Sequence, residues 1–210
     1  MSDDQLKTNP QELRGKVARE AAVLLYFGSE KEYKQAKEKA AETLRTHSLP
    51  SNREVALELD KIADENEGAE RKQHLVQMRQ EALEIMTAIK ACKPVLIGSV
   101  WRGTIRKGSD IDFALFHDHP EEIINLLVKK NLKIVKTEWT RVTKQGKTEA
   151  SFHIFGETTT KNKVEIVVRS PEEAERKRKC EIFGDEITGL NRTQLERILA
   201  ENPTKQFLPA

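Results

Sequence analysis

Cysteine, aromatic residues and long apolar runs are all scarce in this chain of 210 residues. Its two cysteines, Cys92 and Cys180, lie far apart and match no metal-binding or redox motif. No apolar run approaches the length that crosses a membrane, and the polar, acidic residues 1–4 do not resemble a signal peptide. We therefore expect a cytoplasmic protein with reduced cysteines and no membrane partner.

An excess of charge of one sign is also missing. Charged residues make up 33% of the chain, yet the net charge is only +2. This balance excludes a globally basic nucleic-acid-binding protein, so any contact with RNA or DNA must come from a local patch. The charged run 175–179 is one candidate, although such a run is more commonly the solvated face of a helix. High charge with few aromatic residues is also typical of thermophile and archaeal proteins.

What the chain does have is a short segment in which several functional signals follow one another. The apolar residues 95–97 predict a buried strand that ends at Gly98. Because glycine has no Cβ, Gly98 lets backbone amides approach a ligand closely, and Ser99 adds a hydroxyl donor. A second predicted strand carries Asp110 and Asp112, whose spacing of two residues directs both side chains to one face.

Two neighbouring carboxylates repel each other unless a positive charge lies between them. A divalent metal ion is the simplest explanation, and ligands that are all oxygen favour Mg²⁺ or Mn²⁺. Arg102, Arg106 and Lys107 add positive charge to the connecting loop, although each is as easily explained as a solvated surface residue. Metal ion, phosphate-binding turn and basic loop together indicate a site for a nucleoside triphosphate.

This segment resembles the signature of the nucleotidyltransferases that share the catalytic core of DNA polymerase β. The matching residues, in the order and spacing of that signature, are Gly98-Ser99, Arg102-Gly103-Thr104 and Ser109-Asp110-Ile111-Asp112. The form is most similar to class I (archaeal) CCA-adding enzymes and to minimal nucleotidyltransferases, over residues 93–169. The resemblance implies an α+β fold with a small mixed or antiparallel sheet flanked by helices. It also places Thr104 beside the nucleotide, where the alternative role is a turn hydroxyl.

Members of this family use a third carboxylate on a later strand, and Glu165 is the candidate. It lies within the apolar, β-branched run 163–168, where an unpaired acid is difficult to explain as core packing. We expect Glu165 to complete a catalytic, metal-binding set with Asp110 and Asp112. The alternative places Glu165 on a solvent face of its strand. Many relatives carry the shorter Asp at this position.

The chain before residue 92 is predicted to be helical, and its start and stop signals divide it into four helices. These are a helix from Pro10 to Gly28 that is capped by Asn9, one from a capping box at Ser29 to Leu44, one capped by Asn52, and one over residues 69–90. We therefore expect an N-terminal helical region at 1–91 and a catalytic domain with C-terminal helices at 92–210.

Beyond residue 116 the predicted elements are short. They are a helix at 121–130, strands at 132–135, 139–142, 150–155 and 163–168, a charged helix at 172–180, and a helix begun by a capping box at Asn191. His153 lies on a strand of alternating character, and we expect a surface or core histidine there rather than a general base.

The resemblance implies an enzyme of the EC 2.7.7 type. It would move a nucleoside monophosphate from a nucleoside triphosphate, ATP by preference, to an acceptor hydroxyl and release pyrophosphate. An RNA end is the acceptor nearest to the resemblance. Small molecules and protein side chains stay open as acceptors, as does a non-catalytic protein that binds nucleotide or RNA through this fold. The oligomeric state stays open with them.

Overall fold

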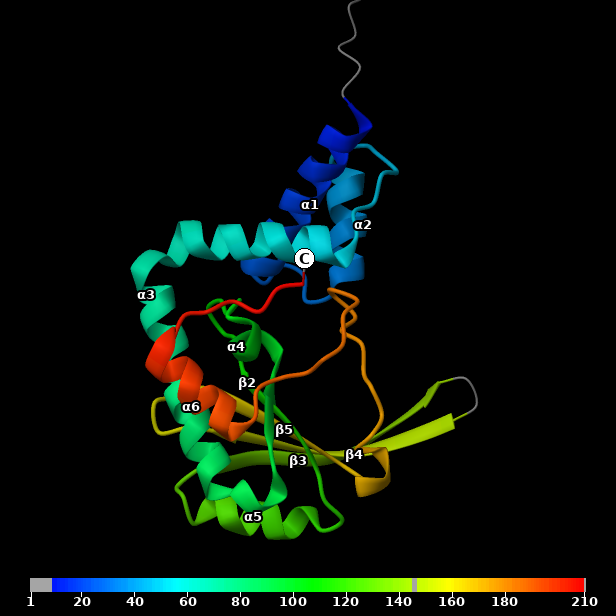
Figure 1. Ribbon diagram of the computed structural model, residues 1–210. Helices are drawn as coiled ribbons and strands as arrows, with labels where there is room; N and C mark the ends of the chain where they lie inside the picture. The colour runs from blue at the N-terminus through cyan, green and yellow to red at the C-terminus, as the bar shows by residue number, and fades with distance from the viewer. Residues whose placement is uncertain (1–8, 145–146, 210) are drawn as a thin grey trace, which may run out of the picture. The chain divides into compact units, whose positions relative to one another are not determined.

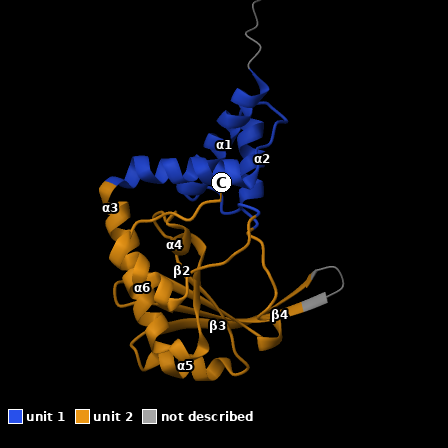
Figure 2. Ribbon diagram, viewed as in Figure 1, with its two compact units in different colours: residues 1–68, 181–184 blue, residues 69–180, 185–210 orange. Residues whose placement is uncertain are grey.

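The computed structural model describes residues 9–144 and 147–209 (Figure 1). It divides into two compact units (Figure 2): one holds the chain up to Gly68 together with residues 181–184, and the other holds residues 69–180 and 185–210. The two units are distinguished by their compactness alone, which does not test where the functional domains meet. The domain boundary expected between residues 91 and 92 therefore stays a prediction. No helix within the described ranges is both long and apolar enough to span a membrane.

The first unit is helical, as predicted. It contains α1 (Pro10–Tyr26), α2 (Tyr33–Thr43) and the first part of α3 (Asn52–Ala88). Its core is built largely from small side chains on facing helices, which are Val17, Ala18, Ala21, Ala22, Leu25, Ala36, Ala40, Ala41, Val55 and Ile62. Alanine-rich faces let helices approach closely, so a short charged chain segment still buries a continuous apolar surface.

The starts of these helices confirm one predicted cap and correct two. The Asn9 side chain accepts a hydrogen bond from the second residue of α1, as expected. Helix α2 begins behind Glu32, whose side chain makes no capping bond, so the predicted capping box at Ser29 is wrong. Helix α3 is capped by Ser51 rather than Asn52, because Ser51 and Glu54 exchange the two hydrogen bonds of a capping box.

Gly68 interrupts α3 with non-helical backbone angles, φ 55° and ψ −134°. The positive φ suits glycine and ends the first part of the helix there. The second part, from residue 69 onward, belongs to the second unit and agrees with the helix predicted for 69–90.

The second unit is built on a five-stranded sheet in the order β1-β2-β5-β4-β3. The strands are β1 (Val95–Ile97), β2 (Ile111–Phe116), β3 (Lys133–Lys144), β4 (Lys147–Glu157) and β5 (Lys163–Arg169). Strands β2 and β5 pair in parallel and the other pairs are antiparallel. The sheet is therefore mixed and flanked by helices, which confirms the predicted α+β fold class.

Further helical segments of this unit accompany the sheet besides the second part of α3. They are α4 (Gly98–Arg102), α5 (Pro120–Val128), α6 (Arg192–Glu201) and the short 3₁₀ helices η1 (Lys90–Cys92) and η2 (Pro171–Glu173). Helix α6 begins at the capping box predicted for Asn191, whose side chain and that of Gln194 each bond the other's backbone amide.

The two strands predicted at 132–135 and 139–142 are one strand, β3, with an irregularity in its register between Ile134 and Lys136. Strands β3 and β4 pair along their whole lengths, whereas β5 pairs with β4 only as far as Ser151. The end of this hairpin therefore extends beyond the rest of the sheet, as Figure 1 shows.

The two faces of the sheet differ. On β2, Ile111, Phe113 and Leu115 are buried, and they join a core with the second part of α3, α5 and α6. The alternate residues, Asp112 among them, are only partly buried. Because side chains alternate across a strand, the helices cover one face and the carboxylates lie on the other, more open face.

The charged helix predicted for 172–180 is wrong. Only the 3₁₀ helix η2 (Pro171–Glu173) forms there, and the chain then runs without regular helix. Arg178 pairs with Glu149 and with Glu173, which holds the segment through charged side chains instead. The physical reason is that this segment has almost no apolar residues and so no stripe that a helix could bury.

Candidate active site

The register of the sheet brings Asp112 and Glu165 together. Asp112 is the direct neighbour of Ile97 on one side and of Glu165 on the other. Neighbouring strands lie about 4.8 Å apart, so the two carboxylates emerge side by side on the open face. Asp110 stands immediately before β2, two residues upstream. The structure thus gathers all three carboxylates proposed from the sequence, although their roles stay predictions.

The backbone at Gly98 passes close to one of these carboxylates. Its φ is +70°, and a Cβ placed on it would lie 2.0 Å from Oδ2 of Asp112. Both the backbone conformation and the missing space therefore require glycine at this position. Ser99 follows in the first turn of α4, where its carbonyl accepts the backbone N–H of Thr104. This bond brings the half-buried Thr104 back beside the start of the helix.

The three carboxylates interact electrostatically. Burial raises the pKa of Asp112 to about 8, with further increases from the negative charges of Glu165 and Asp110. Burial also raises the pKa of Asp110, which the nearby Lys163 opposes and Glu165 reinforces. An acid whose ionised form is disfavoured in this way lacks a compensating positive charge.

The donor set fits a hard divalent cation in chemistry and charge. Three carboxylates supply only oxygen ligands, and a cation among them would remove the repulsion that raises the pKa of Asp112. Their side chains do not surround a common point: within residues 9–144 and 147–209, no three His, Cys, Asp or Glu side chains are arranged as ligands of one ion. One oxygen of Glu165, Oε1, lies within hydrogen-bond distance of Nδ1 of His153.

His153 is a site residue that sequence reasoning missed. Its Nδ1 lies 2.7 Å from Oε1 of Glu165, and its Nε2 lies 2.8 Å from Oγ of Ser151. The ring also stacks on Phe155, with centroids 6.1 Å apart and an angle of 20° between planes. The alternation of residues 151, 153 and 155 signals a shared face, but only the register with β5 shows that this face meets Glu165.

Arg102 has contacts that the sequence did not indicate. The side chain is buried, donates to the Phe207 carbonyl at 3.0 Å and pairs with Asp185 at 2.7 Å. The guanidinium also lies 4.4 Å from the centre of the Trp101 ring. A phosphate contact by Arg102 would have to break these interactions, so that role stays a prediction.

The other two basic residues of the loop are more accessible. Arg106 is half-buried, and its backbone N–H donates to the Ser109 hydroxyl, which closes the turn before Asp110. Lys107 is exposed. Each of the two stays a predicted phosphate-neutralising residue.

The charged run 175–179 is a weaker candidate for binding a polynucleotide than its sequence indicated. Arg176 and Arg178 both pair with Glu149, and Lys177 pairs with Glu186 at 2.9 Å. Acidic side chains therefore neutralise much of the positive charge of this run.

Two buried arginines hold α4 and the loop behind it. Arg79 is 0% exposed, and burial lowers its pKa to about 10. Its guanidinium donates to backbone carbonyls of α4 and of the C-terminal segment, which are those of Val100, Trp101, Pro203 and Lys205. Arg71 donates to the Ile105 carbonyl at 2.6 Å. Sequence alone gives no signal for these contacts, because both arginines resemble solvated residues of a charged helix.

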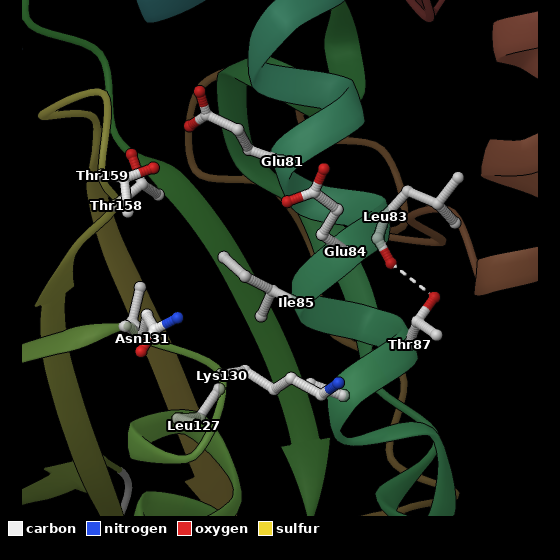
Figure 3. Close-up of a pocket in the computed structure, with 12 residues that line it drawn as sticks. Glu81, Leu83, Glu84, Ile85, Thr87, Leu127, Lys130, Asn131, Thr158 and Thr159 are labelled. Carbon is white, nitrogen blue, oxygen red and sulfur yellow. Dashed lines mark hydrogen bonds between the residues drawn. The ribbon is translucent and has the colours of Figure 1, made fainter.

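A cavity of about 580 Å³ lies elsewhere in this unit, between α3, the end of α5 and the turn before β5 (Figure 3). Glu81 of α3 extends toward that turn, where its carboxylate accepts hydrogen bonds from Thr160 and Asn162. The cavity is lined by Ile85, Leu127 and other described residues, and none of the predicted site residues is among them. It is therefore separate from the carboxylates.

Comparison with known proteins identifies the family. The family model of the nucleotidyltransferase domain matches residues 80–201, which is more than half of the chain. No curated protein matches the sequence.

Solved structures that resemble the chain include the Cid1 poly(U) polymerase bound to MgGTP, at 15% identity and a TM-score of 0.30, over 45% of this chain and 32% of that one. A cytoplasmic RNA terminal U-transferase is 16% identical, with a TM-score of 0.30, over 56% and 34% of the two chains. The GLD-2/RNP-8 complex is 14% identical, with a TM-score of 0.30, over 59% and 44%.

The present chain thus spans less than half of the length of each of these structures. The family match itself includes Gly98, Asp110, Asp112 and the strand that carries Glu165. The chain therefore belongs to the nucleotidyltransferase domain family.

Proposed function

We propose that this protein transfers a nucleoside monophosphate from a nucleoside triphosphate to an acceptor hydroxyl and releases pyrophosphate. The observation that carries the proposal is the cross-strand pair of Asp112 and Glu165, with Asp110 beside it, on the open face of the sheet. Core packing does not explain three acids at one place, because Glu165 and Asp110 both raise the pKa of Asp112 and Glu165 also raises that of Asp110.

In this proposal Asp110, Asp112 and Glu165 hold Mg²⁺ or Mn²⁺. When bound, the ion neutralises triphosphate oxygens and lowers the pKa of the acceptor hydroxyl. The chain's own residues orient the triphosphate: the backbone at Gly98 approaches the phosphates, and the Ser99 hydroxyl donates to a phosphate oxygen.

The remaining predicted site residues neutralise charge or lie beside the nucleotide. Arg106 and Lys107 offset the charge that develops on the leaving pyrophosphate, and Thr104 lies beside the nucleotide. The acceptor oxygen forms a bond to the α-phosphorus while the bond from that phosphorus to the bridging oxygen of pyrophosphate breaks. The acceptor's proton passes to water. No protein nucleophile is needed.

The acceptor that we propose is an RNA end, and ATP is the proposed donor. Support comes from the resemblance to CCA-adding enzymes and from the open face next to the carboxylates. Phe155 is the cross-strand neighbour of Glu165, and Nζ of Lys136 lies 5.6 Å from the centre of its ring. Because Lys136 also pairs with Glu138, the aromatic ring is the feature that suits a nucleobase better than an unrelated small molecule.

The test is incubation of the protein with each α-labelled nucleoside triphosphate, Mg²⁺ or Mn²⁺ and total RNA. Label in RNA supports the full proposal, whereas label on protein or on a small molecule supports transfer with a different acceptor. Nucleotide binding without any transfer would establish the non-catalytic alternative. Asp110→Asn and Asp112→Asn should each abolish transfer while the folded domain persists, and transfer by either variant would contradict the metal-binding assignment.

A further inference from the structure

We propose that His153 is a positioning residue that fixes the carboxylate of Glu165 for metal binding. The inference rests on the proposed function, because it concerns the third carboxylate of that site. The inference goes beyond the proposed function by assigning a role to a residue on β4, a strand that contains no residue of the sequence signature.

The geometry ties down both ends of the imidazole. Nδ1 lies 2.7 Å from Oε1 of Glu165, and Nε2 lies 2.8 Å from Oγ of Ser151. Stacking on Phe155 fixes the plane of the ring. A ring held at both nitrogens and on one face has a single orientation, so it presents a fixed donor to Glu165.

The need for such a donor follows from the length of Glu165. Glutamate has one more rotatable bond than the aspartate that many relatives carry, and an unrestrained glutamate would lose more conformational freedom on binding an ion. The hydrogen bond to His153 occupies Oε1 and leaves Oε2 as the oxygen available to a cation. The side chain is therefore ordered in advance of binding, as outer partners of metal-ligating carboxylates commonly achieve.

The same contacts also have the order of a hydrolase triad, hydroxyl to imidazole to carboxylate. The surroundings of Ser151 do not support that role. Ser151 pairs with Arg169 on one side and with Thr140 on the other, so β4 is an inner strand at this point. The backbone amides around Ser151 face neighbouring strands and are not free to form an oxyanion hole.

The first test compares Mn²⁺ binding by three variants at one fixed pH, from the electron paramagnetic resonance signal of free Mn²⁺. His153→Ala should weaken binding about 10-fold, the lower end of the usual effect of such partners. His153→Asn places an amide donor near the position of Nδ1 and should restore most of the affinity. His153→Gln places its donor near Nε2 and should not. A melting temperature for each variant controls for folding.

The second test is a double-mutant cycle with Glu165→Asp, whose shorter side chain cannot reach His153. We expect His153→Ala to cause no further loss of Mn²⁺ affinity in the Glu165→Asp background. In transfer assays His153→Ala should lower kcat while KM for the acceptor stays unchanged.

Each contrary outcome has a distinct meaning. Equal Mn²⁺ affinity of the wild type and His153→Ala overturns the positioning role and leaves the proposed function intact. Full additivity in the cycle also overturns it. A wild type that neither binds Mn²⁺ nor transfers nucleotide overturns both proposals. Labelling of Ser151 by a fluorophosphonate would show a hydrolase nucleophile and overturn the positioning role.

Discussion

The carboxylate of Asp112 fills the space in which a side chain at position 98 would stand. Oδ2 of Asp112 would lie 2.0 Å from a Cβ on Gly98, and Cγ would lie 2.9 Å from it. The clash falls on the carboxylate itself and not on the end of a long, flexible side chain. The start of α4 and the start of β2 are thus fitted to each other, and a change at either one alters the site.

Gly98→Ala should therefore reduce both nucleotide transfer and Mn²⁺ affinity by at least about 10-fold, because it displaces a carboxylate of the proposed ligand set. Gly184→Ala is a matched control, since Gly184 has a φ of +78° and no atom near the position of a Cβ. The control carries only the backbone strain, about 1 kcal/mol of stability. Equal transfer by the two variants would contradict the fit between Gly98 and Asp112.

Asp112 should make the metal-free protein less stable as the pH rises. Its pKa in the folded protein is raised from 3.8 to about 8, so the folded state binds more protons than the unfolded state between these values. Stability contributed by the protonated acid is fully present below pH 3.8 and is lost as the pH rises toward 8.

The measurement is the melting temperature in EDTA between pH 5 and pH 9, for the wild type and for Asp112→Asn. The melting temperature of the wild type should fall relative to that of the variant as the pH rises. Mg²⁺ should reduce this fall in the wild type and should leave the variant unchanged. Parallel curves for the two proteins would show that Asp112 ionises normally.

Arg79→Met should lower the unfolding free energy of the second unit by about 3 kcal/mol or more, because several buried carbonyls lose their donor together. Urea unfolding measures the loss, and partial proteolysis should show earlier cleavage near Pro203 and Lys205, whose carbonyls accept hydrogen bonds from Arg79. The control is Arg192→Ala, an exposed arginine in an ion pair with Glu196, which should cost no more than about 0.5 kcal/mol. A loss of unfolding free energy for Arg79→Met that is smaller than the loss for Arg192→Ala would contradict a stabilising role for the Arg79 hydrogen bonds.

Arg14 and Glu54 should give the helical unit a stability that depends on acid pH. Arg14 donates to both oxygens of Glu54 at 2.6 Å, and this bond is the main cause that lowers the pKa of Glu54 from 4.5 to about 2. The contribution is present above pH 4.5 and is lost as the pH falls toward 2.

Both side chains are 40% exposed, so solvent screening limits the value of the pair to about 1 kcal/mol. Urea unfolding of Arg14→Ala should show this loss at pH 7 and a shrinking loss below pH 4.5. Lys16→Ala, which removes an exposed ion pair within one helix, is the control and should cost about 0.3 kcal/mol at pH 7. A loss for Arg14→Ala that is independent of pH would assign the effect to packing.

The parts of the fold that the sequence predicted are those whose signals are local. Strands β2 and β5, the cap at Asn9 and the capping box at Asn191 each follow from residues within a few positions of one another. The helix predicted at 172–180 does not form because the segment has no apolar stripe to bury, and its ion pairs with Glu149 of a distant strand are not visible in any local pattern.

The site divides in the same way. The spacing of Asp110 and Asp112 is local, and family resemblance supplied Glu165. The contact of His153 with Glu165 depends on the register between β4 and β5, which no local pattern specifies. The contacts of Arg102 and Arg79 depend on where the C-terminal segment lies, so their burial could not be inferred from their polarity.

The pairing of β2 with β5 determines the order in which the parts of the site are synthesised. Helix α5 and the whole β3–β4 hairpin lie between these two strands in the chain, so the last carboxylate leaves the ribosome well after the first two. Parallel pairs need such long connections, and their contacts form late in folding. A nascent chain that stops before β5 has Asp112 at an open sheet edge and lacks Glu165. The three carboxylates of the proposed site are therefore complete only when synthesis has passed this strand.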